Sequence, residues 1–416
     1  MSCSGSRSHP FWALHHHGTS AQFRYWCPAI LLSAFSRVGA ADLSAKCLAL
    51  GNSLQLENTT ILDVSYIAAP TNVSTLGSCQ SSAPVTAAPL CCVYFAWLPD
   101  TWFGRFLGLG NGGLNGCIQY VDLDYGASLH FATRTALLNA PEVINDFASR
   151  AVHVEAVIGK QLVATYYNTP AAKSYFLGCS TGGRQGTQAA LRFPEDFDGI
   201  LAGAPPTDFN HLAGWDGLLG HYVGAVNTSS SAKAEASPKF ITRELNGTAS
   251  QTTGCLSQVQ VEALKNIYSP LFEADGQLLY RATHPDWKRY AILNRAGYRI
   301  ALFDAINPGG MARFDGDMSA FRERGGGEFI TDHGRRDPLI SSTHSKRVYD
   351  LISHTLSLPP AQMDYFYRLF LIPGVEHCFG VVGPTNFRQG VVPGMESVKN
   401  DTAHNILLAL VHAFFT

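Results

Sequence analysis

The sequence has few charged residues and no long run of basic side chains. Charged residues make up 15% of the 416 positions, and the formal net charge is −2. Nucleic acids and anionic membrane surfaces attract proteins through clustered Lys and Arg, so this charge pattern argues against both as partners. No apolar run reaches the length of about 20 residues that a helix needs to span a bilayer. We therefore expect the mature protein to be soluble.

The ten cysteines include no C-x-x-C pair, the spacing that is typical of zinc and redox sites. Such cysteines suit an oxidising compartment, where they form structural disulfides. N-glycosylation of secreted chains uses N-x-[ST] sequons. Five sequons are present, at Asn58, Asn72, Asn227, Asn246 and Asn400. Both features favour a secreted, extracellular glycoprotein.

The N-terminal region has the features of an export signal. Residues 28–35 form a short apolar core behind an arginine, and residues 38–40 are small enough for a cleavage site. We therefore predict that residues 1–40 are a signal peptide region, with cleavage near Ala40/Ala41.

A serine motif stands near the middle of the chain. A short apolar run at 173–177 leads into Gly-Cys-Ser-Thr-Gly at 178–182, and a helix-like segment follows at 185–191. This G-x-S-x-G pattern is typical of a nucleophile elbow, whose glycines make room for a sharp strand-to-helix turn. The bare pattern also arises by chance, but the strand before it and the helix after it favour catalysis. We predict that Ser180 is a nucleophile and that the Thr181 N–H binds the oxyanion.

An acid and a histidine follow the serine in the order that α/β-hydrolases use. Residues 328–331 are expected to form a strand before a loop that contains Asp337, and residues 369–373 a strand before His377. Both side chains would then lie past the carboxyl ends of strands, where open α/β sheets place their sites. Asp332 is an alternative acid, but we expect it before the loop. We therefore favour Asp337 as the acid and His377 as the base.

Other candidates near these motifs are expected to be structural. The remaining histidines are scattered along the chain, and such histidines are more often structural residues than ligands. Arg184 is expected to pair with Asp196 or Asp198 rather than to contact substrate.

Two cysteines flank these candidates. Ser180 directly follows Cys179, and His377 directly precedes Cys378. A disulfide between Cys179 and Cys378 would hold their Cα atoms roughly 4.4–6.8 Å apart and bring nucleophile and base within hydrogen-bonding reach. Alternatively, Cys179 is a small buried residue of the elbow and Cys378 pairs elsewhere. We favour the disulfide.

Residues 108–113 contain the spacing G-x-G-x-x-G, which also occurs in dinucleotide-binding proteins. The next residues, 115–118, open a helix poorly, and no acidic residue ends a strand at the expected distance. We therefore predict no nucleotide cofactor. In an α/β-hydrolase, a glycine turn after an early strand donates the second oxyanion N–H. Gly112 and Gly113 are both candidates for that donor.

The composition is sufficient for a large hydrophobic core, because 46% of the residues are hydrophobic. A chain of this length forms one large domain or a domain with an insertion. Residues 209–290 are rich in polar segments, which favours an inserted lid domain. We predict an α/β-hydrolase fold with this lid, whose catalytic domain comprises residues 41–208 and 291–416. Within it, residues 41–100 are expected to be β-rich and residues 141–152 to form an amphipathic helix.

Taken together, the motifs resemble the tannase and feruloyl esterase family, and within it the fungal feruloyl esterase B type. The resemblance rests on residues 110–114, 178–186, 193–200, 202–205 and 373–378. It implies that Cys179-Ser180, Asp337 and His377-Cys378 form the Cys-Ser, Asp and His-Cys arrangement of that family. It also implies carboxylic ester hydrolysis without an organic cofactor.

The resemblance suggests further disulfides and a substrate class. It implies that Cys47 pairs with Cys91 or Cys92 and that Cys79 pairs with Cys117. The implied substrate is a small phenolic ester or an esterified polysaccharide. Feruloyl esters of plant cell walls and galloyl esters of tannins are the two classes, and we favour the feruloyl esters. No oligomeric state follows from the sequence.

The chain departs from the family pattern in the predicted lid. Family members carry an Asp-rich calcium loop there, but no such run lies between His221 and Cys255. Calcium is therefore implied by the resemblance but contradicted by this chain, and we predict no metal site. The lid is expected to be shortened, which leaves Cys255 without an obvious partner. An esterase-like protein without catalytic activity is the alternative from another class.

Overall fold

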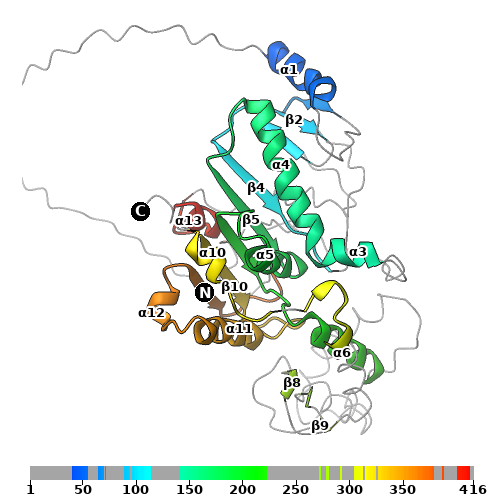
Figure 1. The fold of residues 1–416 in the computed structure, drawn as a ribbon, viewed down its shortest axis with the longest axis vertical. Helices are drawn as coiled ribbons and strands as arrows, with labels where there is room; N and C mark the ends of the chain where they lie inside the picture. The colour runs from blue at the N-terminus through cyan, green and yellow to red at the C-terminus, as the bar shows by residue number, and fades with distance from the viewer. Residues whose placement is uncertain are drawn as a thin grey trace, which may run out of the picture. The chain divides into compact units, whose positions relative to one another are not determined.

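The computed structural model describes about half of the chain in several segments (Figure 1). These are residues 40–54, 64–69, 71, 89–93, 96–113, 141–222, 271–272, 278–280, 291–292, 304–312, 314–324, 327–378, 387 and 401–412. Contacts divide the chain into residues 1–40 and residues 41–416. Only Ala40 of the first unit is described, so the predicted signal peptide region lies outside the described residues.

Within the described residues, five parallel strands form the central sheet, in the order β11-β10-β6-β5-β4. They are β4 (Arg105–Leu109), β5 (Lys173–Cys179), β6 (Gly199–Gly203), β10 (Glu328–Gly334) and β11 (Tyr367–Ile372). The pairing places Cys179 opposite Gly203, and Gly334 opposite Ile372. The carboxyl ends of β5, β6, β10 and β11 therefore meet along one edge, where a site can form.

Helices pack on both faces of this sheet (Figure 1). The packed helices are α4 (Ala151–Tyr167), α5 (Thr181–Arg192), α11 (Ser342–Thr355) and α13 (Ile406–His412). Alternate side chains of a strand point to opposite faces. Phe176 and Ile200 therefore share a core with α4, α5 and α11, whereas Tyr175 and Leu201 pack with Leu410 of α13. Covered faces explain why β6 and β10 are buried along their whole length.

The predicted amphipathic helix at 141–152 is confirmed and belongs to a longer helical run. This run consists of α3 (Pro141–Asn145), a π-helical segment η2 (Asp146–Arg150) and then α4. Pro141 stands at the start, where a missing N–H costs no helical hydrogen bond. Shorter helices elsewhere are η3 (Pro308–Gly310), α10 (Ser319–Glu323) and α12 (Pro360–Met363). None of the described helices is long and apolar enough to cross a membrane.

The segment expected to be β-rich, residues 41–100, is only partly so. It begins with α1 (Ala40–Ser53), a helix that the sequence analysis missed, and continues with an antiparallel sheet. That sheet contains β1 (Ser65–Ile67), β2 (Leu90–Val93) and β3 (Ala96–Pro99). A disulfide between Cys47 and Cys91 joins α1 to the central strand β2. Cys91 rather than Cys92 is therefore the partner of Cys47, and Cys92 is buried beside it.

The region predicted as an inserted lid contributes a helix and a small separate sheet. The helix is α6 (Phe209–Tyr222), and the sheet contains β7 (Leu271–Phe272), β8 (Leu278–Tyr280) and β9 (Ala291–Ile292). The strand order is β8-β7-β9, so the small sheet extends two residues beyond the predicted boundary at residue 290. Cys79, Cys117 and Cys255 lie outside the described residues, and so does the predicted Cys79–Cys117 pair.

Candidate active site

Ser180 occupies a sharp turn between β5 and α5. Its backbone has φ 61° and ψ −124°, and its N–H donates to the Gly203 carbonyl at 2.9 Å. A Cβ atom on Gly178 would lie 2.6 Å from the Gly182 carbonyl carbon, and one on Gly183 would lie 2.2 Å from the Gly203 oxygen. Only glycine fits at these approaches. The strand, the turn and the helix therefore have the arrangement that the G-x-S-x-G pattern predicts.

The loop after β4 packs against the start of α5. The Gln185 side chain accepts from the Asn111 N–H and donates to the Asn111 side-chain oxygen, both at 3.1 Å. The Thr181 hydroxyl donates to the Gly113 carbonyl at 2.6 Å. Gly113 has φ 58°. A Cβ atom added to Gly112 would meet no described atom within 4 Å, so no close contact requires glycine at that position. The structure thus brings Thr181, Gly112 and Gly113 together beside Ser180.

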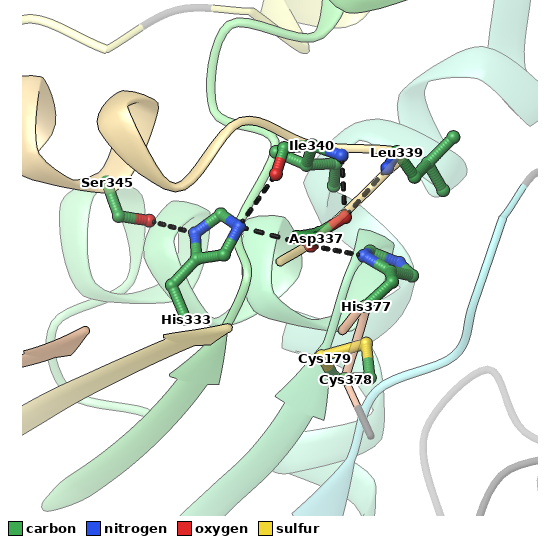
Figure 2. Close-up of a disulfide and its surroundings, with 8 residues drawn as sticks. All are labelled: Cys179, His333, Asp337, Leu339, Ile340, Ser345, His377 and Cys378. Atoms are coloured by element: carbon green, nitrogen blue, oxygen red, sulfur yellow. Dashed lines mark hydrogen bonds and ion pairs between the residues drawn. A yellow bond between two sulfur atoms is a disulfide. The ribbon is translucent and has the colours of Figure 1, made fainter. Parts of the chain in front are cut away.

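Asp337 is buried and is held by four hydrogen-bond donors (Figure 2). Its Oδ1 accepts from the backbone N–H groups of Leu339 and Ile340, each at 2.8 Å. Its Oδ2 lies 2.7 Å from His377 Nδ1 and 3.1 Å from His333 Nε2. Burial alone raises the pKa of the Asp337 carboxyl, but the two histidines outweigh it and hold that pKa well below its usual range. Asp337 is therefore an ionised carboxylate at neutral pH.

The strand before Asp337 is longer than the sequence analysis expected. β10 ends at Gly334 instead of residue 331, because residues 332–334 pair with β11. Asp332 therefore lies inside the strand, where its carbonyl accepts from the Ala204 N–H at 2.8 Å. Asp337 is the carboxylate that contacts His377.

His377 is connected to the elbow through its neighbour. Cys378 forms a disulfide with Cys179, with 6.0 Å between their Cα atoms, as the sequence predicts. The bond joins the residue before Ser180 to the residue after His377 (Figure 2). His377 Nε2 is buried and has no hydrogen-bond partner within the described part of the chain. Nδ1 of the imidazole is therefore hydrogen-bonded to Asp337, whereas Nε2 has no partner among the described residues.

The loops that carry Asp337 and His377 are also joined through their backbones. The Arg335 N–H donates to Ile372 at 2.9 Å, and the Arg336 N–H donates to Val375 at 3.0 Å. A Cβ on Gly334 would lie 2.3 Å from the carbonyl oxygens of Val375 and Glu376, so the close approach requires glycine. The Asp–His geometry therefore rests on main-chain contacts as well as on the side chains.

His333 is the residue at this site that the sequence analysis missed. It was grouped with the histidines of structural role, yet it contacts Asp337 from the end of β10. The only signal in the sequence was its place four residues before Asp337. Its side chain also reaches the Ile340 carbonyl and the Ser345 hydroxyl.

Arg184 was expected to pair with Asp196 or Asp198, and this prediction was wrong. Its guanidinium donates to the carbonyls of Phe147 and Ala148, each at 2.8 Å, and lies over the Phe147 ring. The π-helical segment η2 presents these carbonyls to α5. Arg184 is fully buried, and burial lowers its pKa to about 9. Its contacts give it a structural role beneath the elbow.

No group of three or more His, Cys, Asp or Glu side chains in the described residues is placed to hold a metal ion. Residues 223–270, where the calcium loop of the family would fall, lie outside the described part. The described residues therefore offer no ligand set for calcium.

The parallel sheet with helices on both faces, the elbow and the carboxyl-edge site define the class of protein. It is an α/β-hydrolase. The family model described as tannase and feruloyl esterase matches residues 77–243 and 310–412, more than half of the chain. The chain belongs to this family, and it is a carboxylic ester hydrolase.

Individual relatives agree with this assignment. The probable feruloyl esterase B of Aspergillus clavatus is 34% identical, and the match covers 88% of this chain and 85% of that protein. The crystal structure of feruloyl esterase B from Aspergillus oryzae superposes with a TM-score of 0.73 at 29% identity, covering 89% of this chain and 90% of that chain. Tannin acyl hydrolase from Aspergillus niger shares the fold, with a TM-score of 0.54 at 16% identity over 81% of this chain and 83% of that one.

Proposed function

We propose that this esterase hydrolyses feruloyl esters through an acyl-enzyme, with Ser180 as nucleophile, His377 as base and Asp337 as acid. One observation carries the proposal. The Cys179–Cys378 disulfide joins the neighbours of Ser180 and His377, while His377 Nδ1 is bonded to Asp337. Ser180, His377 and Asp337 thereby lie past three separate strand ends at one edge of the sheet, which supports these roles.

Each residue has a defined task in the reaction. His377 Nε2 takes the proton of Ser180 as the hydroxyl attacks the ester carbonyl, and it returns a proton to the departing alcohol. Asp337 accepts from Nδ1–H, which keeps the proton off Nε2 and stabilises the imidazolium. Water activated by the same histidine then cleaves the acyl-enzyme. Carboxylic acid and free enzyme are the products.

The developing oxyanion needs donors near Ser180. The first N–H groups of a helix have no partner within the helix, and Thr181 opens α5. The Asn111 N–H is already bonded to Gln185, so the Gly112 or Gly113 N–H supplies the second donor. Each such donor lowers the barrier by roughly 3–4 kcal/mol.

The choice of feruloyl esters rests on the relatives that are named feruloyl esterase B and cover most of the chain. Galloyl esters are the second candidate class, because the family name includes tannase. We also propose that residues 209–290 form a lid over the site and that the protein is secreted. The two disulfides found in the described segments and the sequons support export.

The test is hydrolysis of methyl ferulate and methyl gallate by the purified protein. We expect turnover of methyl ferulate, a loss of about 10⁶-fold in kcat for Ser180→Ala, and labelling of Ser180 by a fluorophosphonate. Turnover of methyl gallate alone would reassign the substrate class. Full activity of Ser180→Ala would overturn the mechanism.

A further inference from the structure

The Asp337 carboxylate is shared by two histidines, and the reaction proposed above uses only one of them. His377 and His333 both approach Oδ2, at 2.7 and 3.1 Å. The side chains of His333 and Asp337 have no exposed surface, so water does not compete for these contacts. Figure 2 shows Asp337 between the two imidazole rings.

The contacts of His333 determine which of its nitrogens carries a proton. Nε2 lies 3.0 Å from the Ile340 carbonyl and 3.1 Å from Asp337 Oδ2, and both atoms only accept. Nε2 is therefore the N–H. At the other side of the ring, Nδ1 lies 2.7 Å from the Ser345 hydroxyl, and Ser345 is fully buried in α11. The ring is thus held at both nitrogens and donates toward Asp337.

This donor completes the restraint on the carboxylate. The N–H groups of Leu339 and Ile340 bind Oδ1. His333 binds Oδ2 at the place where it meets His377 Nδ1. Rotation of the carboxylate about the Cβ–Cγ bond would therefore weaken hydrogen bonds at both oxygens, and the donor from His333 adds to that restraint independently of His377.

We propose that His333 is a positioning residue for the catalytic acid. It fixes Oδ2 of Asp337 against His377 and connects that acid through Ser345 to helix α11. This inference rests on the proposed function, because it assigns His333 to the same triad. His333 is buried behind Asp337 and takes no part in substrate contact or proton transfer.

Two substitutions of His333 separate the donor from the bulk of the ring. His333→Leu removes the N–H, and His333→Gln keeps a side-chain amide donor toward Oδ2. A well-placed catalytic group is sensitive to shifts of about 1 Å. We expect His333→Leu to lower kcat by about 10-fold or more with KM changed less than about twofold, and His333→Gln to recover most of the rate. Rates are expressed per site titrated to completion with a fluorophosphonate.

His153→Leu is the matched control. His153 Nδ1 lies 2.9 Å from Asp196, and the ring stacks on Phe193, so the substitution also removes a histidine–aspartate contact. Asp196 precedes β6 and therefore lies at the opposite edge of the sheet. We expect this control to lower the melting temperature while kcat per titrated site stays unchanged.

A double-mutant cycle with Asp337→Ala shows whether His333 acts through the acid. With the carboxylate gone, His333→Leu should have no further effect on kcat, because it has nothing left to position. An equal loss in both backgrounds would overturn the inference, and so would a His333→Leu enzyme as fast as the wild type per titrated site. Both results leave the proposed function standing as long as Ser180→Ala is inactive. An active Ser180→Ala enzyme would instead refute the proposed function.

Discussion

The central sheet has an amino edge, where its parallel strands begin, and a carboxyl edge, where they end. The two edges hold their buried polar groups in different ways. At the amino edge, Asp198 accepts from the N–H and hydroxyl of Ser174 and from Lys173 and Arg324. At the carboxyl edge, the buried His377 Nε2 has no hydrogen-bond partner in the part of the chain that the structure describes, and Ser180 has φ 61°. Positive φ costs free energy for any residue with a side chain. The carboxylate at the amino edge thus has several donors, whereas a buried imidazole nitrogen at the carboxyl edge has no partner among the described residues.

Asp337→Asn gives the largest expected contrast between the edges. The amide can no longer keep His377 in the required tautomer, so kcat should fall by about 10⁴-fold. The counterpart at the amino edge, Asp198→Asn, should leave kcat unchanged. Steady-state hydrolysis of methyl ferulate measures both. Equal losses in the two variants would show that the edges do not differ in function.

The two described disulfides offer the next contrast. The chain-entropy model gives them similar effects on stability, roughly 4 kcal/mol for the 44-residue separation of Cys47–Cys91 and roughly 5 kcal/mol for the 199-residue separation of Cys179–Cys378. Removing either bond with paired Ser substitutions should lower the melting temperature. Loss of Cys179–Cys378 should also lower kcat per folded molecule by about 10-fold or more, since it frees His377, the proposed base, from Ser180. A normal kcat without that bond would contradict its role in alignment.

The wild type and the Asp198→Asn variant should differ in how their free energy of unfolding depends on pH in the acid range. Burial raises the pKa of Asp198, but the donors from Ser174 and Lys173 outweigh it and hold the pKa below its usual range. A lowered pKa in the folded state contributes stability that is present above the unfolded pKa of about 3.9 and is lost as the pH falls through the folded value. Urea unfolding at pH 7 should show Asp198→Asn less stable by roughly 1–3 kcal/mol. This difference should shrink toward pH 3, and a constant difference would contradict the assignment.

The smallest expected effect lies at His211, next to the carboxyl edge. Burial lowers its pKa, but Asp208 and Asp304, at 2.8 and 2.7 Å, outweigh burial and raise it to about 9. Its contribution to stability is therefore complete below the unfolded pKa of about 6.5 and is lost as the pH rises through about 9. Thermal unfolding between pH 6 and 10 should show this loss, and His211→Gln should flatten it. An unchanged profile in that variant would rule out the assignment.

The sequence predicted the elbow well because glycine spacing reports close backbone approach directly. The places of Gly178, Ser180 and Gly183 in the turn could be predicted from the local sequence pattern alone. The sequence paired Asp337 with His377, the contact that the structure has, because chain order in this fold limits the choice. His333 was missed because β10 extends to Gly334 only through its pairing with β11, a contact distant in sequence. The partners of Arg184 were missed for a similar reason, since no pattern marked the π-helical carbonyls of η2.

The backbone of Ser180 has a consequence for protein engineering. At φ 61° and ψ −124°, glycine is the residue that fits with least strain, so Ser180→Gly should fold into a more stable and inert protein. Selection of variants for thermal stability alone should therefore enrich for loss of Ser180, the proposed nucleophile. Screens that raise the melting temperature of this esterase need turnover as a second criterion, because we expect the most stable and the most active sequence to differ at this position.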